Sequence, residues 1–132
     1  MRKPIEKPRC GGLWTEAKYK AFIKNALRMA SMKWGPIGQC SKEARVSRGM
    51  YTCASCLETV PSSIKVEGQR KKKRNIKVDH IEPVICPIRG FVSWDEVVSR
   101  MFVEKEGLQL LCSSCHDIKT KEEREIRKNN KK

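Results

Sequence analysis

Residues 108–116, Leu-Gln-Leu-Leu-Cys-Ser-Ser-Cys-His, place a short apolar strand directly before a Cys-x-x-Cys pair and a histidine. A second Cys-x-x-Cys pair lies upstream, at residues 53–56. Zinc prefers four tetrahedral ligands, and a two-residue gap lets both sulfurs of a pair reach one ion. The spacing therefore predicts a structural zinc bound by Cys53, Cys56, Cys112 and Cys115. The alternatives are two unrelated buried pairs or a redox dithiol, although the βαβ pattern expected of a thioredoxin-like protein is absent.

The chain has only two histidines, His80 and His116, and His80 follows Asp79. Hydrolysis of a phosphodiester needs a base for water and a cation to neutralise developing charge. We predict that Asp79 and His116 hold a catalytic divalent cation, which could be Mg²⁺, Mn²⁺, Ni²⁺ or Zn²⁺. His80 is then free to act as the general base. The alternative is that Asp79-His80 is an ordinary strand end and that His116 merely lies near the zinc.

The composition favours a nucleic acid as partner. In 132 residues, Lys and Arg outnumber Asp and Glu by 29 to 15, which gives a net charge of +14. The chain shows neither an apolar run long enough to span a membrane nor a secretory signal, so we expect a cytoplasmic protein with reduced cysteines. The predicted phosphate contacts are Arg70, Lys71, Lys72, Lys73, Arg74 and Lys119, although a basic run can also be a solvated loop.

The order of predicted elements indicates an α+β protein. Residues 1–12 are expected to form an irregular basic arm, and residues 13–50 an N-terminal helical extension. Helical periodicity runs from Thr15, a candidate N-cap, to Trp34, and a short basic helix is expected over residues 41–48. Strands are predicted at 75–81 and 108–111, separated by a helix that starts at the capping box Ser93-Trp94-Asp95-Glu96. A last helix begins near residues 112–115 and leads into a charged tail, residues 121–132, which is expected to fray.

From Cys53 to Thr120 the sequence resembles the HNH endonucleases. The resemblance rests on Val78-Asp79-His80-Ile81-Glu82-Pro83, on residues 107–116 and on Lys119-Thr120, and the layout is most similar to small bacteriophage members. It implies a ββα-metal, treble-clef-like finger over residues 51–120 with a structural zinc. It also implies that Asp79 and His116 bind the catalytic metal, that His80 is the base and that the products are 5′-phosphate and 3′-hydroxyl ends.

These patterns together predict an endonuclease that nicks or cuts double-stranded DNA as a monomer or weak dimer. One position departs from the family pattern, because Gly107 stands where an Asn usually precedes the second strand. Two alternatives stay open. One is a non-catalytic zinc module that binds nucleic acid, and the other is an accessory nuclease subunit of a phage packaging or homing system with a protein partner.

Overall fold

The computed structural model describes residues 2–130 and divides into two compact units, Met1–Lys33 and Trp34–Lys132. The predicted boundary at residue 50 therefore differs from the division seen here, because the segment after residue 33 belongs to the second unit. Within residues 2–130, no helix is both long enough and apolar enough to cross a membrane.

The first unit is built on one helix, α1 (Glu16–Ser31). The Thr15 side chain accepts a hydrogen bond from the Lys18 amide, so the predicted N-cap is confirmed. Arg9 pairs with Glu16 in the first turn and also covers the ring of Tyr19. The helix ends three residues before the predicted end at Trp34, and Gly35-Pro36 opens the next helix, where a proline at the start is tolerated.

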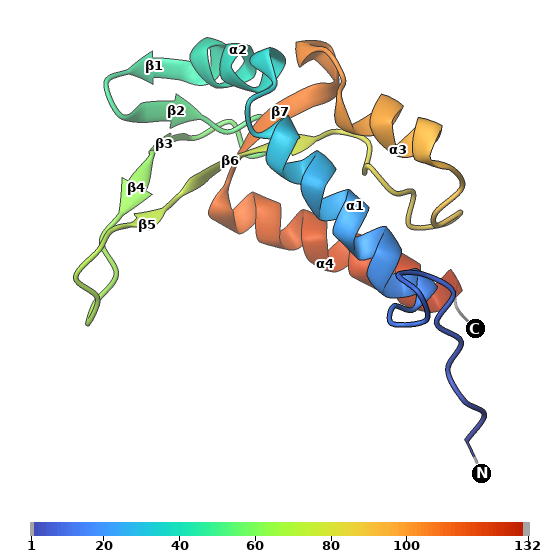
Figure 1. The fold of residues 1–132 in the computed structure, drawn as a ribbon. Coiled ribbons are helices and arrows are strands. Elements are labelled where there is room, and N and C mark those ends of the chain that lie inside the picture. The colour runs from blue at the N-terminus through green and yellow to red at the C-terminus, as the bar shows by residue number, and fades with distance from the viewer. Residues whose placement is uncertain (1, 131–132) are drawn as a thin grey trace. The chain divides into compact units, whose positions relative to one another are not determined.

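The second unit mixes short strands and helices (Figure 1). Its elements are α2 (Gly35–Ala44), β1 (Arg45–Ser47), β2 (Met50–Thr52), β3 (Thr59–Pro61), β4 (Ser63–Ile64), β5 (Lys73–Arg74), β6 (Ile76–His80), α3 (Trp94–Met101), the 3₁₀ turn η1 (Lys105–Gly107), β7 (Leu108–Cys112) and α4 (Ser113–Asn130). Strands β1, β2 and β3 form one antiparallel sheet, while β4 pairs with β5 and β6 pairs with β7.

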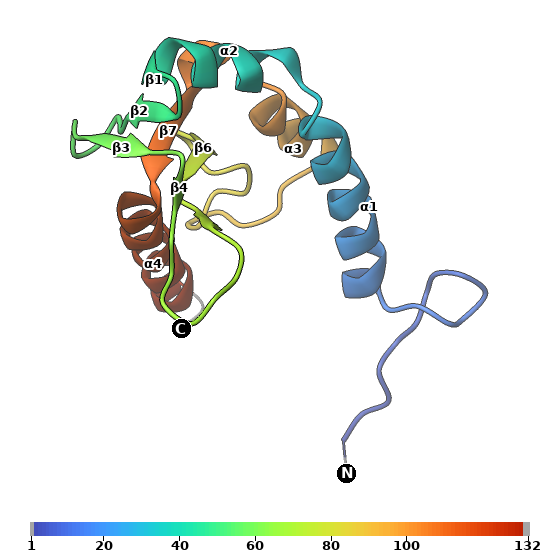
Figure 2. The same cartoon turned by 90° about the vertical axis from the view of Figure 1, so that its left-hand side faces the viewer.

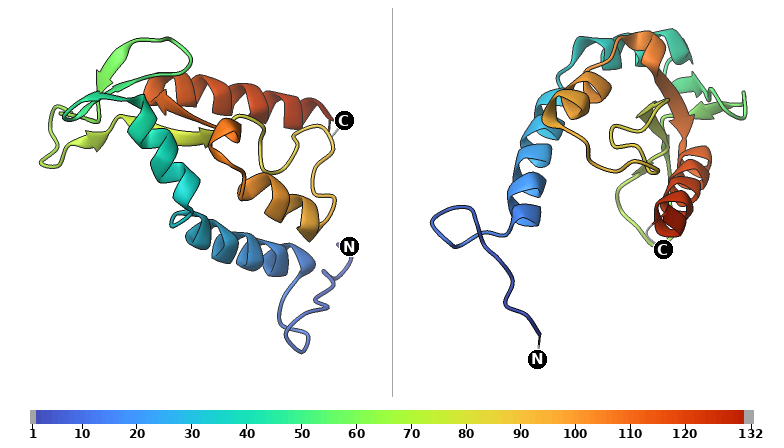
Figure 3. Two further views of the ribbon diagram at one scale, coloured as in Figure 1. Left: turned by 90° about the horizontal axis from the view of Figure 1, so that it is seen from above. Right: turned by 90° about the vertical axis from the view of Figure 1, so that its right-hand side faces the viewer.

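The β6–β7 pair lies at the centre of this unit. Its register is continuous from Ile76 opposite Cys112 to His80 opposite Leu108. Helix α4 follows β7 directly and packs against both strands, and α2 contacts the same pair (Figures 2 and 3). Apart from the buried cysteines and Pro36 of α2, the buried apolar side chains come from these strands and from α3: Ile76, Leu108, Leu110, Leu111, Val97 and Met101. Such a core is small, as expected for a unit of this length.

Asn75 joins three parts of the second unit. Its side-chain amide donates to the Pro61 carbonyl, and its side-chain oxygen accepts from the Ser113 hydroxyl at 2.7 Å. Its backbone N–H donates to the Ser62 carbonyl, and its own carbonyl accepts from the Ser113 amide. This buried residue therefore fixes the end of β3, the start of β6 and the first residue of α4 to one another.

Three sequence predictions need correction. The chain leaves the helical conformation after Ala44, so the predicted basic helix over residues 41–48 is replaced by the end of α2 and by β1. The charged tail does not fray within the described residues, because α4 continues to Asn130; a Lys119–Glu123 pair one turn apart supports it. The Ser93 cap is confirmed, but the Glu96 side chain pairs with Arg89 and Arg100.

We predict that Asn75→Ala lowers the free energy of unfolding by about 2–3 kcal/mol, because it removes two hydrogen bonds and leaves the Pro61 carbonyl without its partner. Urea denaturation followed by circular dichroism measures the change. The matched control is Asn129→Ala on the exposed last turn of α4, which should change stability by less than about 0.5 kcal/mol. Equal effects of the two substitutions would contradict this role of Asn75.

Candidate metal centres and nucleic-acid interface

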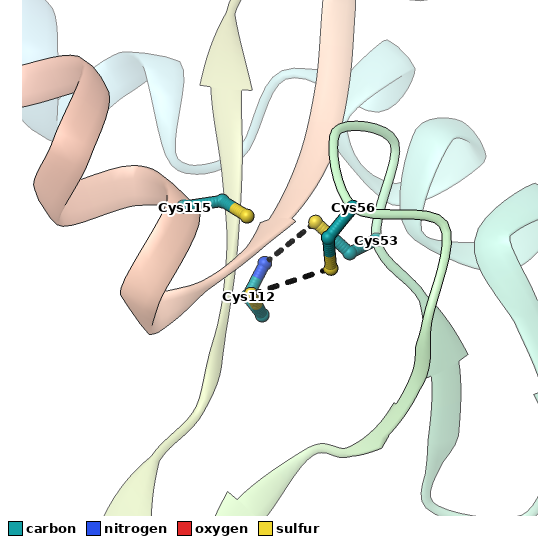
Figure 4. A group of neighbouring side chains, drawn as sticks. All are labelled: Cys53, Cys56, Cys112 and Cys115. Atoms are coloured by element: carbon teal, nitrogen blue, oxygen red, sulfur yellow. Dashed lines mark hydrogen bonds between the residues drawn. The ribbon is translucent and has the colours of Figure 1, made fainter.

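The four cysteines come from two separate parts of the chain (Figure 4). Cys53 and Cys56 lie in the turn between β2 and β3, where the Leu57 amide donates to the Cys53 carbonyl. Leu57 adopts a positive φ of 63°, which turns the chain back toward β3. Cys112 ends β7, and Cys115 lies in the first turn of α4. The turn is fixed to the strand because the Ala54 amide donates to the Leu110 carbonyl.

The sulfur geometry fits a metal ion such as zinc. All four sulfurs lie within 4.8 Å of one another, and Cys56 Sγ and Cys112 Sγ are 4.0 Å apart. A tetrahedral zinc with bonds of about 2.3 Å would separate its sulfurs by about 3.8 Å. Within residues 2–130, this is the one group of three or more such ligand residues so close together. The structure therefore confirms that the four predicted cysteines form one group that could hold a metal ion.

The backbone favours a negative charge on this cluster. Burial raises the pKa of Cys53, but hydrogen bonds from the amides of Cys112, Cys56 and Ser55 outweigh burial and bring the pKa to about 6. The hydrogen bond to the Cys112 thiol is the largest of the effects that raise the pKa of Cys115 to about 12. Neighbouring thiolates repel one another, so these thiols do not readily lose their protons together. A bound cation would offset that repulsion.

Asp79 and His116 lie together beside this cluster. Asp79 is in β6 and His116 is in the first turn of α4, and Asp79 Oδ1 is 4.0 Å from His116 Nε2. Both side chains are about one-fifth exposed. Two ligand atoms that are each about 2.1 Å from one ion lie about 3.0 Å apart at a right angle and about 3.4 Å apart at the tetrahedral angle. A side-chain movement of less than about 1 Å would therefore let this pair share a divalent cation.

His80 lies on the other side of the strand. Adjacent strand residues point to opposite faces, and the His80 ring contacts the end of α3, where Nε2 is 2.7 Å from the Met101 carbonyl oxygen. A carbonyl only accepts, so Nε2 donates its proton, and in the neutral ring Nδ1 has a free lone pair. Among the described residues, the ring makes no hydrogen bond or ion pair with Asp79 or His116.

Lys119 was predicted as a phosphate contact, but its ammonium is close to three protein oxygens. It donates to Asp79 Oδ2 at 2.5 Å and to the His80 carbonyl at 2.6 Å, and it pairs with Glu123 Oε1 at 3.2 Å. Burial lowers the pKa of Lys119, but the bond and charge of Asp79 and then those of Glu123 outweigh burial, so the pKa is raised overall. The Lys119 side chain therefore stays charged within this group.

Two residues of this site were not predicted from the sequence. One is Met101, which contacts His80 through its backbone carbonyl, so the identity of its side chain gives no sign of this role. The other is Glu123. Its spacing from His116 and Lys119, seven and four residues, puts all three on one side of a helix, and this periodicity is visible in the sequence.

The basic run lies on the β4–β5 hairpin. Its loop, residues 65–72, extends away from the β6–β7 pair (Figure 1). All five basic residues of the run are exposed, namely Arg70, Lys71, Lys72, Lys73 and Arg74. Arg74 also donates to the Ile76 carbonyl, which fixes the base of the hairpin to β6.

Comparison with protein-family models finds no match to this chain, and neither a curated protein nor a solved structure matches it.

Gly107 is closely packed. A Cβ at this position would lie 2.9 Å from a Val103 methyl carbon, which is closer than real side chains come. The backbone of Val103 is restrained, because its carbonyl accepts a hydrogen bond from the Trp34 indole at 2.7 Å. The Gly107 carbonyl accepts from the Ile81 amide just after β6. An added side chain at this position would therefore force Val103 to shift.

We predict that the purified protein carries one zinc per chain and that Cys112→Ser loses it, with loss of helical structure in the second unit, because in small domains metal binding stabilises the fold directly. Elemental analysis and circular dichroism measure both effects. Cys10→Ser is the matched control, since Cys10 lies in the first unit and is exposed. A full zinc content in Cys112→Ser would contradict the four-cysteine site.

We predict that Gly107→Ala lowers the free energy of unfolding by about 1–3 kcal/mol through overpacking against Val103. In a double-mutant cycle with Val103→Ala, the added methyl group should cost less, because the space is then available. Gly38→Ala is the control, since nothing lies near its Cβ and alanine favours the helix by up to about 1 kcal/mol. If Gly107→Ala is as stable as the natural protein, the packing argument is wrong.

Proposed function

We propose that this protein is a metal-dependent DNA endonuclease of the HNH type. The observation that carries the proposal is the 4.0 Å approach of Asp79 Oδ1 to His116 Nε2. Two antiparallel strands followed by a helix, β6, β7 and α4, hold these residues, and a metal ion bound by the four cysteines would fix the strand to the helix. This arrangement supports a ββα-metal finger, with Gly107 in place of the family Asn.

In the proposed reaction, Asp79 and His116 hold a divalent cation, which when bound supplies positive charge that stabilises the scissile phosphate and the leaving 3′ oxygen. Asp79 and His80 are the last two residues of β6, so their side chains could flank one phosphate at the strand end although they point to opposite faces. His80 would accept a proton at Nδ1 from a water molecule whose oxygen forms a new bond to phosphorus. The P–O3′ bond breaks, the leaving 3′ oxygen takes a proton from solvent water, and the products are a 5′-phosphate and a 3′-hydroxyl. The Met101 carbonyl holds the His80 ring in the tautomer that this step needs.

Double-stranded DNA is the proposed substrate. The net charge of +14 and the exposed basic hairpin favour contact with a phosphate backbone, which gives affinity without base readout. A zinc module that binds nucleic acid without cutting it is the second candidate, and the packed Gly107 favours it, since no side chain there can brace the loop that follows His80.

Nicking of a supercoiled plasmid in Mg²⁺, Mn²⁺ or Ni²⁺ tests the proposal. We expect His80→Ala to reduce the rate by about 10²- to 10⁴-fold, the usual contribution of a general base. His80→Gln is the second variant, because its amide can still donate to the Met101 carbonyl but cannot take a proton. Ser99→Ala, at an exposed position of α3, is the matched control.

Zinc content and DNA affinity are measured for each variant, so that a loss of fold is not mistaken for a loss of chemistry. Binding of DNA without cutting by the natural protein in all three metals would reject the nuclease and favour the non-catalytic module. Cutting by both His80 variants at the natural rate would remove His80 from its proposed role.

A further inference from the structure

We propose that Lys119 is a positioning residue of the Asp79–His116 site and that it does not contact DNA phosphate. The inference rests on the proposed function, because it concerns how that site holds its cation. It replaces the role that the sequence predicted for this lysine, a phosphate contact on the last helix.

The ammonium already makes two hydrogen bonds and one ion pair with protein oxygens. A lysine ammonium has three N–H donors and no acceptor. Its three oxygen partners are Asp79 Oδ2, the His80 carbonyl and Glu123 Oε1. The Lys119 side chain is 23% exposed, in contrast to the five exposed residues of the basic hairpin. A phosphate contact would require at least one of these partners to be given up.

The two oxygens of Asp79 have different partners. Oδ2 accepts from Lys119, while Oδ1 faces His116 Nε2. The terminal torsion of an aspartate side chain is broad, so an unrestrained carboxylate could turn either oxygen toward the histidine or rotate away. The bond from Lys119 holds one oxygen and thereby presents the other to the place where a shared cation would bind.

Lys119 also joins the helix to the end of the strand. Its bond to the His80 carbonyl fixes the backbone of the residue proposed as the base, while the ring of that residue is held by Met101. Glu123, one turn further along α4, pairs with the same ammonium and restrains its position. The Lys119 side chain thus holds α4 at a set distance from β6, both at Asp79 and at His80.

Residues that orient metal ligands usually contribute 10- to 100-fold to metal affinity. We therefore expect Lys119→Met to weaken Mn²⁺ binding by about 10-fold or more, although removing a positive charge would by itself favour a cation. The affinity is measured by calorimetry on the zinc-loaded protein without DNA. Lys119→Arg keeps the positive charge but replaces the one ammonium nitrogen, which reaches all three oxygens, by a planar guanidinium. This variant should also bind Mn²⁺ more weakly.

Lys121→Met is the matched control, since Lys121 is two residues further along α4 and exposed. DNA affinity without added divalent ions is measured over a range of salt concentrations for all variants. Neutralising a true phosphate contact reduces the salt slope by about one, and we expect no such change for Lys119→Met. Full zinc content in each variant shows that the fold is retained.

The outcomes separate this inference from the proposed function. Natural Mn²⁺ affinity in both Lys119 variants, or a reduced salt slope for Lys119→Met without a change in Mn²⁺ affinity, overturns the positioning role and leaves the nuclease proposal standing. An Asp79→Ala variant identifies the site itself. If the natural protein binds Mn²⁺ no better than Asp79→Ala does, the proposed catalytic site and the role of Lys119 are both rejected.

Discussion

Four sulfurs from two distant parts of the chain meet in the second unit, and a metal ion held between them would join those parts. The chain between Cys56 and Cys112 includes the basic hairpin, β6 and α3, and the cluster brings the ends of that segment within 4.8 Å. The buried apolar core around it is small, with Leu111 packed directly against Cys53 and Cys112. Because Cys112 ends a strand and Cys115 begins a helix, a metal ion held here would set the direction in which α4 leaves β7.

That direction determines where the remaining polar residues meet. His116 and Lys119 follow Cys115 on the same helix, and both face Asp79 in β6. The strand pleat then sends the next side chain, His80, to the opposite face, where the end of α3 holds its ring. The two halves of the proposed chemistry, holding a cation and accepting a proton, thus lie on neighbouring residues but are supported by different helices.

Gly107 stands where the HNH endonucleases, which the sequence resembles, usually have an Asn. A larger side chain here would have to displace the Val103 side chain, and the backbone of Val103 is held by a hydrogen bond from the Trp34 indole. The end of β6 is restrained in other ways, by the Gly107 carbonyl on the Ile81 amide and by the bond from Lys119 to the His80 carbonyl. The backbone and the last helix therefore restrain the end of β6 without a side chain at residue 107.

Some features of this protein can be predicted without a structure, because they depend on spacing and on local hydrogen bonds. The two Cys-x-x-Cys pairs, the strands that contain residues 76–80 and 108–111, and the caps at Thr15 and Ser93 follow from such rules and are present. Four features became visible only in the folded chain: the partners of Lys119, the contact of His80 with a backbone carbonyl, the place of α2 in the second unit and the close packing of Gly107 against Val103. Each of these features depends on groups that are far apart in the chain. The distance between such groups is set by tertiary packing, which cannot be predicted from a local sequence pattern.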